Sequence, residues 1–220
     1  MRLPFATYGR RELLLYGGLF LALAVAVGFW HPWAAVLPGL GCLATLNFFR
    51  DPERAIPPEH DAVVSPADGT VTDVTEMDER AWIGERAVRV GIFLSIFDVH
   101  VNRSPADAEV RLVQYRKGRF HSALKPECAA ENESNLLGLA AAPSGVRMTV
   151  KQISGAIARR IVCPLSQGSR VAKGERIGMI KFGSRTELYL PASARPEVLV
   201  KKGDRVRGGQ TILFRLNLEK

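Results

Sequence analysis

The stretch Arg176-Ile-Gly-Met-Ile-Lys-Phe-Gly-Ser-Arg-Thr-Glu-Leu-Tyr-Leu-Pro191 holds two apolar runs on either side of a Gly-Ser dipeptide. The pattern of apolar residues in each run predicts two β-strands. Gly183-Ser184 between them is typical of a tight turn, because glycine adopts backbone angles that other residues avoid. The stretch therefore predicts a strand, a tight turn and a second strand.

Gly183 and Ser184 also permit a reaction of the chain with itself. Gly183 has no Cβ, so its carbonyl carbon is open to attack, and Ser184 places a hydroxyl beside it. If the turn is strained and a base lies near, this attack converts the amide into an ester. Elimination then breaks the chain and leaves a dehydroalanine, which hydrolyses to a pyruvoyl group. A plain turn is the alternative, and the surrounding sequence decides between the two.

A short repeat flanks this stretch. Lys173-Gly-Glu-Arg-Ile177 recurs as Lys202-Gly-Asp-Arg-Val206, and each copy sets a Lys-Gly-acid turn before a short strand. The glycine supplies a positive φ, and the acid is expected to bond the backbone of its own loop. This repeat predicts two structurally equivalent turns in the last third of the chain.

Strand patterns continue through the rest of the chain from residue 63 onward. Residues 63–64 and 71–74 are expected to pair as a hairpin, and residues 118–140 are expected to form a loop or short helix. Further strands are expected over 87–97, 109–115, 146–150 and 157–163. The sequence therefore predicts a mainly β domain over residues 63–220.

The first fifty residues are strongly apolar. Runs of 18 and 17 residues, 13–30 and 33–49, hold no charge, and His31-Pro32 separates them. Each run is at the lower limit for a hydrocarbon core about 30 Å thick. Trp30 and Trp33 at the bend, with arginines at both outer ends, predict a helical membrane hairpin over 1–50 with both ends in the cytoplasm. A cleaved signal peptide and a buried soluble hairpin are the alternatives, and a proline-rich connector, 51–62, follows.

The composition narrows the class of partner. The chain has 220 residues, a formal net charge of +8 and a pI of about 9.8, which suits an anionic partner. Because no nucleic-acid motif is present, the apolar N-terminus favours an anionic membrane over nucleic acid. Cys42, Cys128 and Cys163 have neither zinc spacing nor a disulfide framework, so three reduced thiols are expected.

Several polar positions offer groups able to act with a nucleophilic serine. Asp98, His100 and Asn102 alternate with valines, which predicts that the three side chains share one strand face. A histidine oriented by an aspartate is a good base near neutral pH, and a histidine bonded to a strand neighbour is the alternative. Asp68 lies before a glycine in a sequence typical of a structural turn.

Arg159 and Arg160 are adjacent on a predicted strand, so at most one of them reaches a given site. A guanidinium suits a phosphodiester, which makes this pair a candidate for binding a lipid phosphate. His31, His60 and His121 have no partner pattern and are interpreted as incidental.

Six short stretches carry a family resemblance when they are taken in order. They are Phe48-Phe-Arg-Asp-Pro-Glu-Arg54, Ser65-Pro-Ala-Asp-Gly69, Phe97-Asp-Val-His-Val-Asn-Arg103, Glu131-Asn-Glu-Ser-Asn135, Ala158-Arg-Arg-Ile-Val-Cys163 and Gly174-Glu-Arg-Ile-Gly-Met-Ile-Lys-Phe-Gly-Ser184. In this order they resemble the phosphatidylserine decarboxylase family in its short form. The resemblance covers most of the chain from residue 48 onward.

The resemblance implies a lipoyl/biotinyl-like (hybrid-motif) β-domain that cleaves itself between Gly183 and Ser184. Ser184 becomes a covalent pyruvoyl cofactor, and the two parts stay together as a large and a small chain. Asp68 and His100 assist the serine. His100 is then expected to serve both steps, because this chain has Arg103 where relatives carry a second histidine.

The activity implied by the resemblance is decarboxylation of phosphatidylserine to phosphatidylethanolamine, with no metal and no diffusible cofactor. The enzyme is expected at the cytoplasmic face of the cell membrane, with a phospholipid substrate, Arg160 near its phosphate, and no nucleic acid. A homodimer, the lipid backbone, and a spanning or re-entrant hairpin are left open.

Two other classes compete with this hypothesis. A membrane-anchored adaptor with a non-enzymatic lipoyl-like β-domain keeps an intact, inert Gly183-Ser184. A membrane-tethered hydrolase keeps Ser184 as a stable nucleophile, and the absence of a Gly-x-Ser-x-Gly elbow counts against it.

Overall fold

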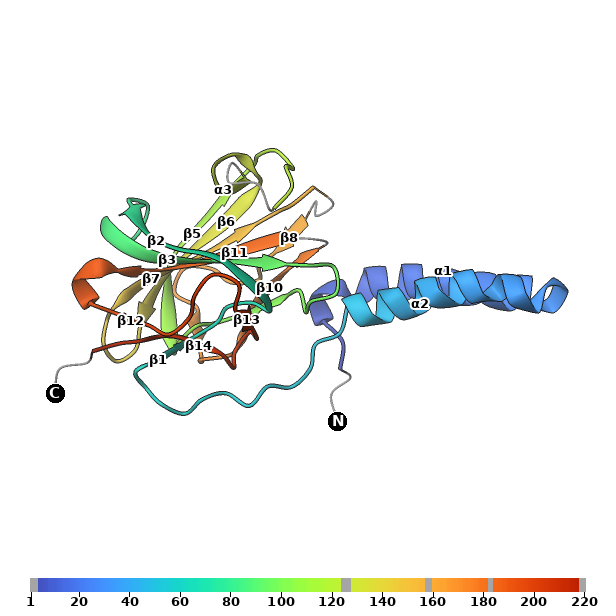
Figure 1. The fold of residues 1–220 in the computed structure, drawn as a ribbon, viewed down its shortest axis with the longest axis horizontal. Coiled ribbons are helices and arrows are strands. Elements are labelled where there is room, and N and C mark those ends of the chain that lie inside the picture. The colour runs from blue at the N-terminus through green and yellow to red at the C-terminus, as the bar shows by residue number, and fades with distance from the viewer. Residues whose placement is uncertain (1–3, 124–127, 157–159, 182–183, 218–220) are drawn as a thin grey trace. The chain divides into compact units, whose positions relative to one another are not determined.

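The computed structural model describes residues 4–123, 128–156, 160–181 and 184–217. It divides into two compact units, Met1–Glu53 and Arg54–Lys220. The first unit is helical and the second is mainly β (Figure 1). The prediction of a mainly β chain with an apolar helical N-terminus is therefore confirmed.

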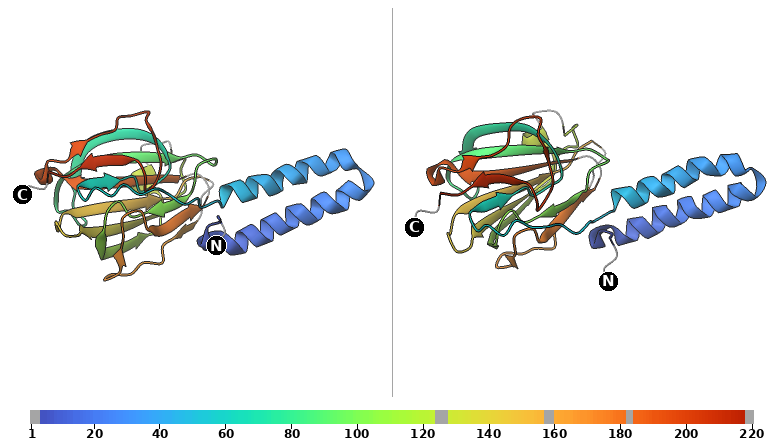
Figure 2. Two further views of the ribbon diagram at one scale, coloured as in Figure 1. Left: turned by 90° about the horizontal axis from the view of Figure 1, so that it is seen from below. Right: turned by 60° about the horizontal axis from the view of Figure 1, so that its bottom comes forward.

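The first unit is a pair of antiparallel helices, which Figure 2 shows side by side. A 3-10 turn, η1 (Thr7–Gly9), leads into α1 (Arg10–Trp30), and η2 (Pro32–Ala35) leads into α2 (Val36–Phe48). Two backbone hydrogen bonds join the ends of the pair, from Ala6 N–H to the Phe49 carbonyl at 2.8 Å and from Asp51 N–H to the Pro4 carbonyl at 2.7 Å. Both ends of the hairpin therefore leave it on the same side.

Small residues bring the two helices into contact. A Cβ at Gly41 would lie 2.8 Å from the Phe20 ring, so only glycine leaves room for that ring. The Cys42 thiol lies 3.8 Å from the Gly17 carbonyl of the facing helix. Close approach through small residues is typical of helices that pack in a membrane.

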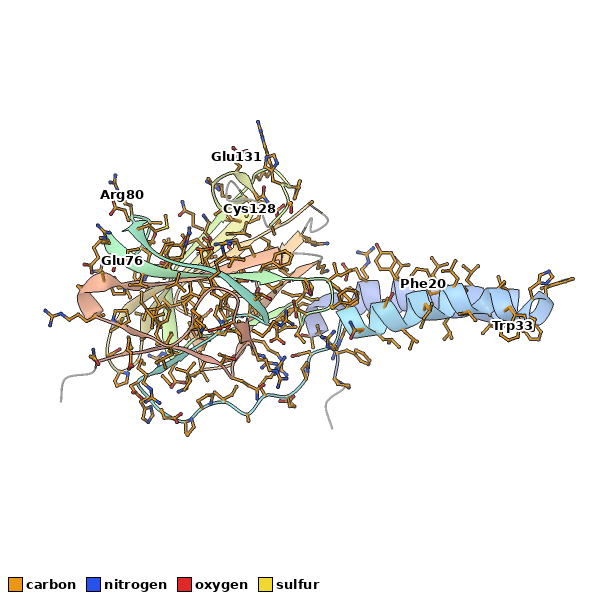
Figure 3. All side chains as sticks on the ribbon, viewed as in Figure 1. Phe20, Trp33, Glu76, Arg80, Cys128 and Glu131 are labelled. Atoms are coloured by element: carbon orange, nitrogen blue, oxygen red, sulfur yellow. The ribbon has the colours of Figure 1, made fainter. Side chains whose placement is uncertain are left out.

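The apolar side chains of the hairpin point outward. The segment Thr7–Trp30, with mean hydropathy 2.2, is long and apolar enough to cross a membrane by length and composition, and Pro32–Phe48 is shorter. Figure 3 places Trp33 at the tip of the hairpin, and its side chain is 90% exposed. Exposed apolar surface of this extent is not stable in water, so it requires a covering.

The second unit contains three antiparallel sheets. Their strand orders are β13-β2-β3-β11-β7-β6-β5-β9, β4-β10-β8 and β1-β14-β12. The elements are β1 (Ala62–Val64), β2 (Gly69–Glu79), β3 (Glu85–Leu94), β4 (Val101–Arg103), β5 (Ala108–Arg116), α3 (Cys128–Glu131), β6 (Ser134–Ala141), β7 (Arg147–Ile153), β8 (Arg160–Val162), β9 (Arg170–Val171), β10 (Arg176–Lys181), β11 (Ser184–Pro191), η3 (Ala192–Ala194), β12 (Glu197–Val198), β13 (Arg205–Val206) and β14 (Ile212–Arg215).

The core lies on one face of the eight-stranded sheet, called here the interior face. Leu137, Val150, Leu188 and Val90 pair across β6, β7, β11 and β3 in one row, and all four are fully buried. Alternation along each strand delivers these side chains to the same face. Burying each contributes about 1.5–3 kcal/mol, so this row holds the middle of the sheet together.

The two Lys-Gly-acid turns have equivalent geometry. Gly174 and Gly203 have φ angles of 77° and 97°. The Glu175 carboxylate accepts a hydrogen bond from Ala172 N–H at 2.8 Å. The Asp204 carboxylate accepts one from Lys201 N–H at 2.9 Å. Both roles predicted for the repeat, the positive φ and the bond to the loop backbone, are confirmed.

A second repeat accompanies the first. Ser65-Pro-Ala-Asp68 recurs as Ser104-Pro-Ala-Asp107. Each serine hydroxyl donates to the carbonyl two residues on, at 2.7 Å in both copies. Each copy's proline carbonyl accepts, at 2.9 Å, an N–H from the residue that precedes the other copy's serine. The two copies are thus related by an approximate internal two-fold symmetry.

Two expectations about strands are wrong. Residues 63–64 do not pair with 71–74: β1 pairs with β14, and β2 pairs with β3. The backbone between residues 64 and 71 makes other hydrogen bonds. The Ser65 and Pro66 carbonyls accept N–H groups from Gly209 and Arg103. The expected loop or short helix over 118–140 holds for α3, but β6 is a central strand, because its Leu and Ala side chains fill the interior face.

Candidate active site

Ser184 is the first residue of β11, and β10 precedes it. Figure 1 shows β11 between β3 and β7, and Ser184 pairs with Leu94 of β3. Its side chain is fully buried. The two predicted strands are confirmed, whereas Gly183 and the turn lie outside the described residues.

The interior face changes from apolar to polar at the end of the sheet that carries Ser184. One step beyond the Leu137–Val150–Leu188 row, the paired residues are Asn135, Gln152 and Thr186. One further step along the same two strands lie Ser154 and Ser184. Together with two residues at the start of β4, these side chains form a buried polar layer: His100, Asn102, Asn135, Gln152, Ser154, Ser184 and Thr186.

Amide side chains connect the middle of the polar layer. Asn135 Nδ2 donates to Gln152 Oε1 at 3.0 Å, and Gln152 Nε2 donates to Asn102 Oδ1 at 2.8 Å. Asn102 Nδ2 then donates to Thr186 Oγ1 at 3.1 Å. Because the amides of Gln152 and Asn102 are bonded at both ends, these two side chains are fixed in orientation.

Two hydroxyls in the polar layer take no part in these hydrogen bonds. Only four buried side-chain nitrogen or oxygen atoms lack a hydrogen-bond partner among the described residues. Two are the Nε atoms of Arg54 and Arg89, and two are the hydroxyls of Ser154 and Ser184. An unsatisfied buried hydroxyl costs about 1–3 kcal/mol. Both unpaired hydroxyls therefore mark this end of the interior face as a site that is incomplete without a further group.

His100 is fully buried, and its tautomer follows from its surroundings. Its Nδ1 lies 2.9 Å from the Asp98 backbone carbonyl, which can only accept a hydrogen bond. The proton of a neutral ring is therefore on Nδ1, and Nε2 is the basic nitrogen of the ring.

The expectation that Asp98 shares a face with His100 and Asn102 is wrong. The Asp98 carboxylate turns back to bond the N–H and hydroxyl of Ser95, both at 2.8 Å, and Arg205 at 2.6 Å. Burial acts to raise the pKa of the Asp98 carboxyl, but these hydrogen bonds outweigh it and the pKa is lowered. Asp98 thus orients the histidine through its backbone, because β4 begins only at Val101.

The ladder between β4 and β10 brings His100 to the end of β10 that leads to Ser184. Gly178 pairs with Asn102, and the N–H of Ile180, two residues later, donates to the His100 carbonyl at 3.2 Å. Asn102 of β4 in turn bonds Thr186 of β11, two residues after Ser184. The backbone of His100 is therefore bonded to Ile180, four residues before Ser184 in the chain.

Asp68 is held by two other groups. Its carboxylate accepts from Arg54 Nη2 at 2.7 Å and from Gly208 N–H at 2.8 Å. Burial raises the pKa of the Asp68 carboxyl above its ordinary value, although Arg54 acts to lower it. The negative charge of Asp98 acts in the same direction as burial, which places the two carboxylates within electrostatic range of each other.

Arg160 lies on β8 directly opposite Lys181 of β10. Two cations are thus paired on neighbouring strands. One of them, Lys181, is three residues before Ser184 in the sequence. Arg159 lies outside the described residues. Arg103 points to the other face of β4 from His100, and its Nη1 donates to the Gly174 carbonyl at 3.0 Å.

The opposite face of β11, called here the outer face, carries a charged cluster that sequence reasoning missed. Arg185 donates to Thr72, Asp73 and Glu187, all at 2.7 Å, and Tyr189 donates to Glu187 at 2.5 Å. Burial acts to raise the pKa of the Asp73 carboxyl, but the hydrogen bonds from Arg185 and Thr72 outweigh it and the pKa is lowered. The available signal was the alternation of Arg185, Glu187 and Tyr189 along the strand, with Leu188 and Leu190 on its other face.

Glycine makes room for this cluster. A Cβ at Gly91, which pairs with Glu187, would lie 2.0 Å from the Arg185 guanidinium and 2.7 Å from the Asp73 carboxylate. Any side chain at this position would therefore displace the ion pair.

The sequence matches the family model "Phosphatidylserine decarboxylase" over residues 43–214. The chain belongs to the phosphatidylserine decarboxylase family. It is 49% identical over 208 residues to a phosphatidylserine decarboxylase proenzyme of Symbiobacterium thermophilum, covering 94% of each chain. It is 45% identical over 199 residues to the proenzyme of Carboxydothermus hydrogenoformans, covering 90% of this chain and 91% of the relative. A third proenzyme, from Rhodopirellula baltica, is 42% identical over 215 residues, or 97% and 88% of the two chains.

The family match spans the whole polar layer, Asp68 and Arg160. All three cysteines are free thiols, as expected. Among the described residues, no group of three or more histidine, cysteine, aspartate or glutamate side chains is placed to hold a metal ion.

Proposed function

We propose that this chain is a self-processing, pyruvoyl-dependent decarboxylase that converts phosphatidylserine to phosphatidylethanolamine. Membership of the family and relatives named as proenzymes support this function. The single observation that carries it is the fully buried, unpaired Ser184 hydroxyl at the head of β11. A buried hydroxyl with no structural partner is free to react.

Self-processing uses the chain's own groups. His100 accepts the Ser184 proton at Nε2, and the Ser184 oxygen attacks the carbonyl carbon of residue 183. The amide becomes an ester, and elimination leaves a carboxylate on Gly183 and a dehydroalanine at residue 184. Addition of water and loss of ammonia give the pyruvoyl group. Asp68 contributes negative charge that stabilises the protonated His100.

The site fits a pyruvoyl group at residue 184. Neither unpaired hydroxyl has a hydrogen-bond partner that the new carbonyl acceptor would displace. This group supplies a ketone that accepts a substrate amine and withdraws electrons while carbon dioxide leaves. His100 then delivers a proton to the carbon that lost the carboxylate. The apolar Leu137–Val150–Leu188 row behind the layer keeps bulk water away from this end of the sheet.

Arg160 and Lys181 are proposed to bind the lipid phosphate. The two residues are Cα partners on neighbouring strands, so their positive side chains form a pair that suits an anion. The planar guanidinium of Arg160 matches a phosphodiester.

The proposed domains are a membrane hairpin over 1–50, a connector over 51–62 and a catalytic domain over 63–220. The two repeats and their internal two-fold symmetry support a lipoyl/biotinyl-like, hybrid-motif fold for the catalytic domain. Residues 1–183 and 184–220 are the proposed large and small chains, which the β11–β3, β11–β7 and β1–β14 ladders hold together.

The proposed location is the cytoplasmic face of the cell membrane. The α1 helix of 21 residues is about 31 Å long, which matches the hydrocarbon core of a bilayer. Arg10, Arg11 and Arg50 lie at the base of the hairpin and Trp30 and Trp33 near its tip. By the positive-inside rule, this arrangement supports a cytoplasmic position for the base of the hairpin and so for the catalytic domain.

The test is an assay of the full chain in vesicles that contain phosphatidylserine, with phosphatidylethanolamine measured by mass spectrometry. The wild-type chain forms product, Ser184→Ala forms none, and Arg160→Ala is processed normally with a KM raised about 10-fold, equivalent to about 1.4 kcal/mol. A folded wild-type chain that forms no product would instead support the adaptor with a non-enzymatic β-domain.

A further inference from the structure

Ser154 is the second unpaired hydroxyl of the polar layer, and the proposed function as stated above gives it no task. It follows β7 directly, and its side chain is fully buried. A serine buried at this cost is expected to have a partner in some state of the protein. The identity of that partner follows from the position of Ser154 in the sheet.

The hydrogen-bond ladders place Ser154 opposite Ser184. The last pair between β7 and β11 is Ile153 with Arg185, so one further step brings the two serines together. Both remain in the plane of the sheet: Ser154 N–H donates to the Glu133 carbonyl at 2.9 Å, and Ser184 pairs with Leu94. Directly opposite residues in an antiparallel pair have Cβ atoms about 4.5–5.5 Å apart on the same face.

The other neighbours of Ser184 on this face are apolar or already hydrogen-bonded. Leu94, on the β3 side, is apolar. Thr186 and Gln152 each have a hydrogen bond to Asn102. Among the described neighbours within the sheet, Ser154 is therefore the one that faces residue 184 with an unpaired hydroxyl.

We propose that the Ser154 hydroxyl binds the ketone oxygen that processing creates at residue 184. This inference rests on the proposed function, since it requires the ketone. Before processing, each of the two serines is both a donor and an acceptor, yet neither is bonded. During processing, the Ser184 oxygen leaves with the carboxylate of residue 183. The ketone oxygen takes the place of the nitrogen at Cα and is an acceptor only, and the Ser154 hydroxyl on the same face is a donor already within the site.

The hydrogen bond also has a chemical consequence. A donor aimed at a ketone oxygen draws electron density from the carbonyl carbon and stabilises the negative charge that develops when an amine adds to it. Because the donor is fixed by β7, it does not reorganise during the reaction. Ser154 therefore both orients the ketone and makes it more electrophilic.

A purely structural role for Ser154 predicts that Ser154→Ala lowers the stability of the precursor, whereas our inference predicts that it does not. In the Ser184→Ala precursor, where no ketone forms, Ser154→Ala removes an unsatisfied buried hydroxyl and should leave Tm unchanged or raised. The matched control is Thr186→Val in the same background. This change strips a partner from Asn102 and should lower Tm, since a buried donor left unpaired costs about 1–3 kcal/mol.

The decisive experiment compares wild-type, Ser154→Ala and Ser154→Cys full-length chains after processing. The small chain is followed by mass spectrometry as hydroxylamine captures the ketone, and kcat and KM are measured separately. Ser154→Ala should be processed, with ketone capture slowed about 10-fold and kcat lowered about 10- to 100-fold at nearly constant KM. Ser154→Cys, which keeps a weak donor of similar size, should fall between the two.

Two results would overturn the inference. In the first, processed Ser154→Ala captures hydroxylamine and turns over at wild-type rates, which leaves the proposed function intact. In the second, Ser154→Ala folds but stays a single chain, because Ser154 then acts before the ketone exists. A wild-type chain that never divides is a separate result, which refutes the proposed function itself.

Discussion

The two faces of β11 are both buried and both polar, yet they differ in how their polar groups are satisfied. On the outer face, Arg185, Glu187 and Tyr189 belong to a cluster in which all four carboxylate oxygens of Glu187 and Asp73 are engaged. On the interior face, Ser184 and its neighbour Ser154 have no partner among the described residues. Burial of polar groups is thus common to both faces. The atom left unpaired on the outer face, Arg89 Nε, belongs to a guanidinium that still bonds Asp73, whereas the interior face has two hydroxyls with no partner among the described residues.

This difference between the two faces predicts different effects of substitution on each. A paired buried ion cluster adds little net stability, but removal of one partner is expensive because it strands a charge. An unpaired hydroxyl, in contrast, is a cost to the folded state that its removal relieves. Substitutions on the outer face should therefore change folding, and substitutions on the interior face should change reaction rates.

The largest effect on the interior face is expected at His100. His100→Ala removes the base proposed for Ser184, so processing and decarboxylation should each slow by about 100-fold or more. Processing is measured as the fraction of divided chain over time after synthesis. His60→Ala is the matched control, because His60 is exposed and should change neither rate. Normal processing and turnover in His100→Ala would show that the base lies elsewhere.

On the outer face, Glu187→Gln tests most directly whether substitutions there change stability. This change leaves the guanidinium groups of Arg185 and Arg89 facing a neutral amide, so the free energy of unfolding should fall by about 3 kcal/mol. The control is Glu76→Gln. Glu76 forms an exposed pair with Arg86 and lies at the surface in Figure 3, so its loss should cost about 0.5 kcal/mol or less.

Processing of Glu187→Gln should be normal at temperatures where the chain is fully folded. Denaturant titration gives the stability, and intact mass gives the processing of the same sample. If the folded variant fails to divide, the outer face takes part in the chemistry and the distinction between the two faces is lost.

The smallest effect is expected from the two copies of the Ser-Pro-Ala-Asp turn. Asp68 is buried beside Arg54, and its pKa is raised, chiefly by burial. Asp107 is exposed and accepts a hydrogen bond from Lys173 N–H at 2.9 Å. Asp68→Asn removes the charge proposed to stabilise protonated His100, so processing should slow about 10-fold, which corresponds to about 1.4 kcal/mol. Asp107→Asn should leave the rate unchanged, and equal rates in the two variants would make Asp68 structural.

Local patterns in the sequence were sufficient for part of this account. Apolar runs predicted the helical hairpin, a Lys-Gly-acid repeat predicted two equivalent turns, and the Gly183-Ser184 dipeptide marked the start of β11. Each of these features depends on residues that are close together in the sequence, so the sequence alone predicts it. The second repeat, Ser65 to Asp68 and Ser104 to Asp107, was equally legible and was overlooked.

Features that depend on strand register were not predictable. Ser154 and Ser184 are 30 positions apart, and only the pairing of β7 with β11 makes them neighbours. The carboxylate of Asp98 turned away from His100 because the strand begins later than the alternation suggested. In both cases the deciding information is which strand lies beside which, and the sequence pattern of a single strand does not contain it.

The intact mass of the purified protein tests the central claim most directly. The account predicts two chains that divide before residue 184, the smaller one blocked to N-terminal sequencing by its pyruvoyl group. A folded single chain of 24.1 kDa that stays undivided with time would contradict it.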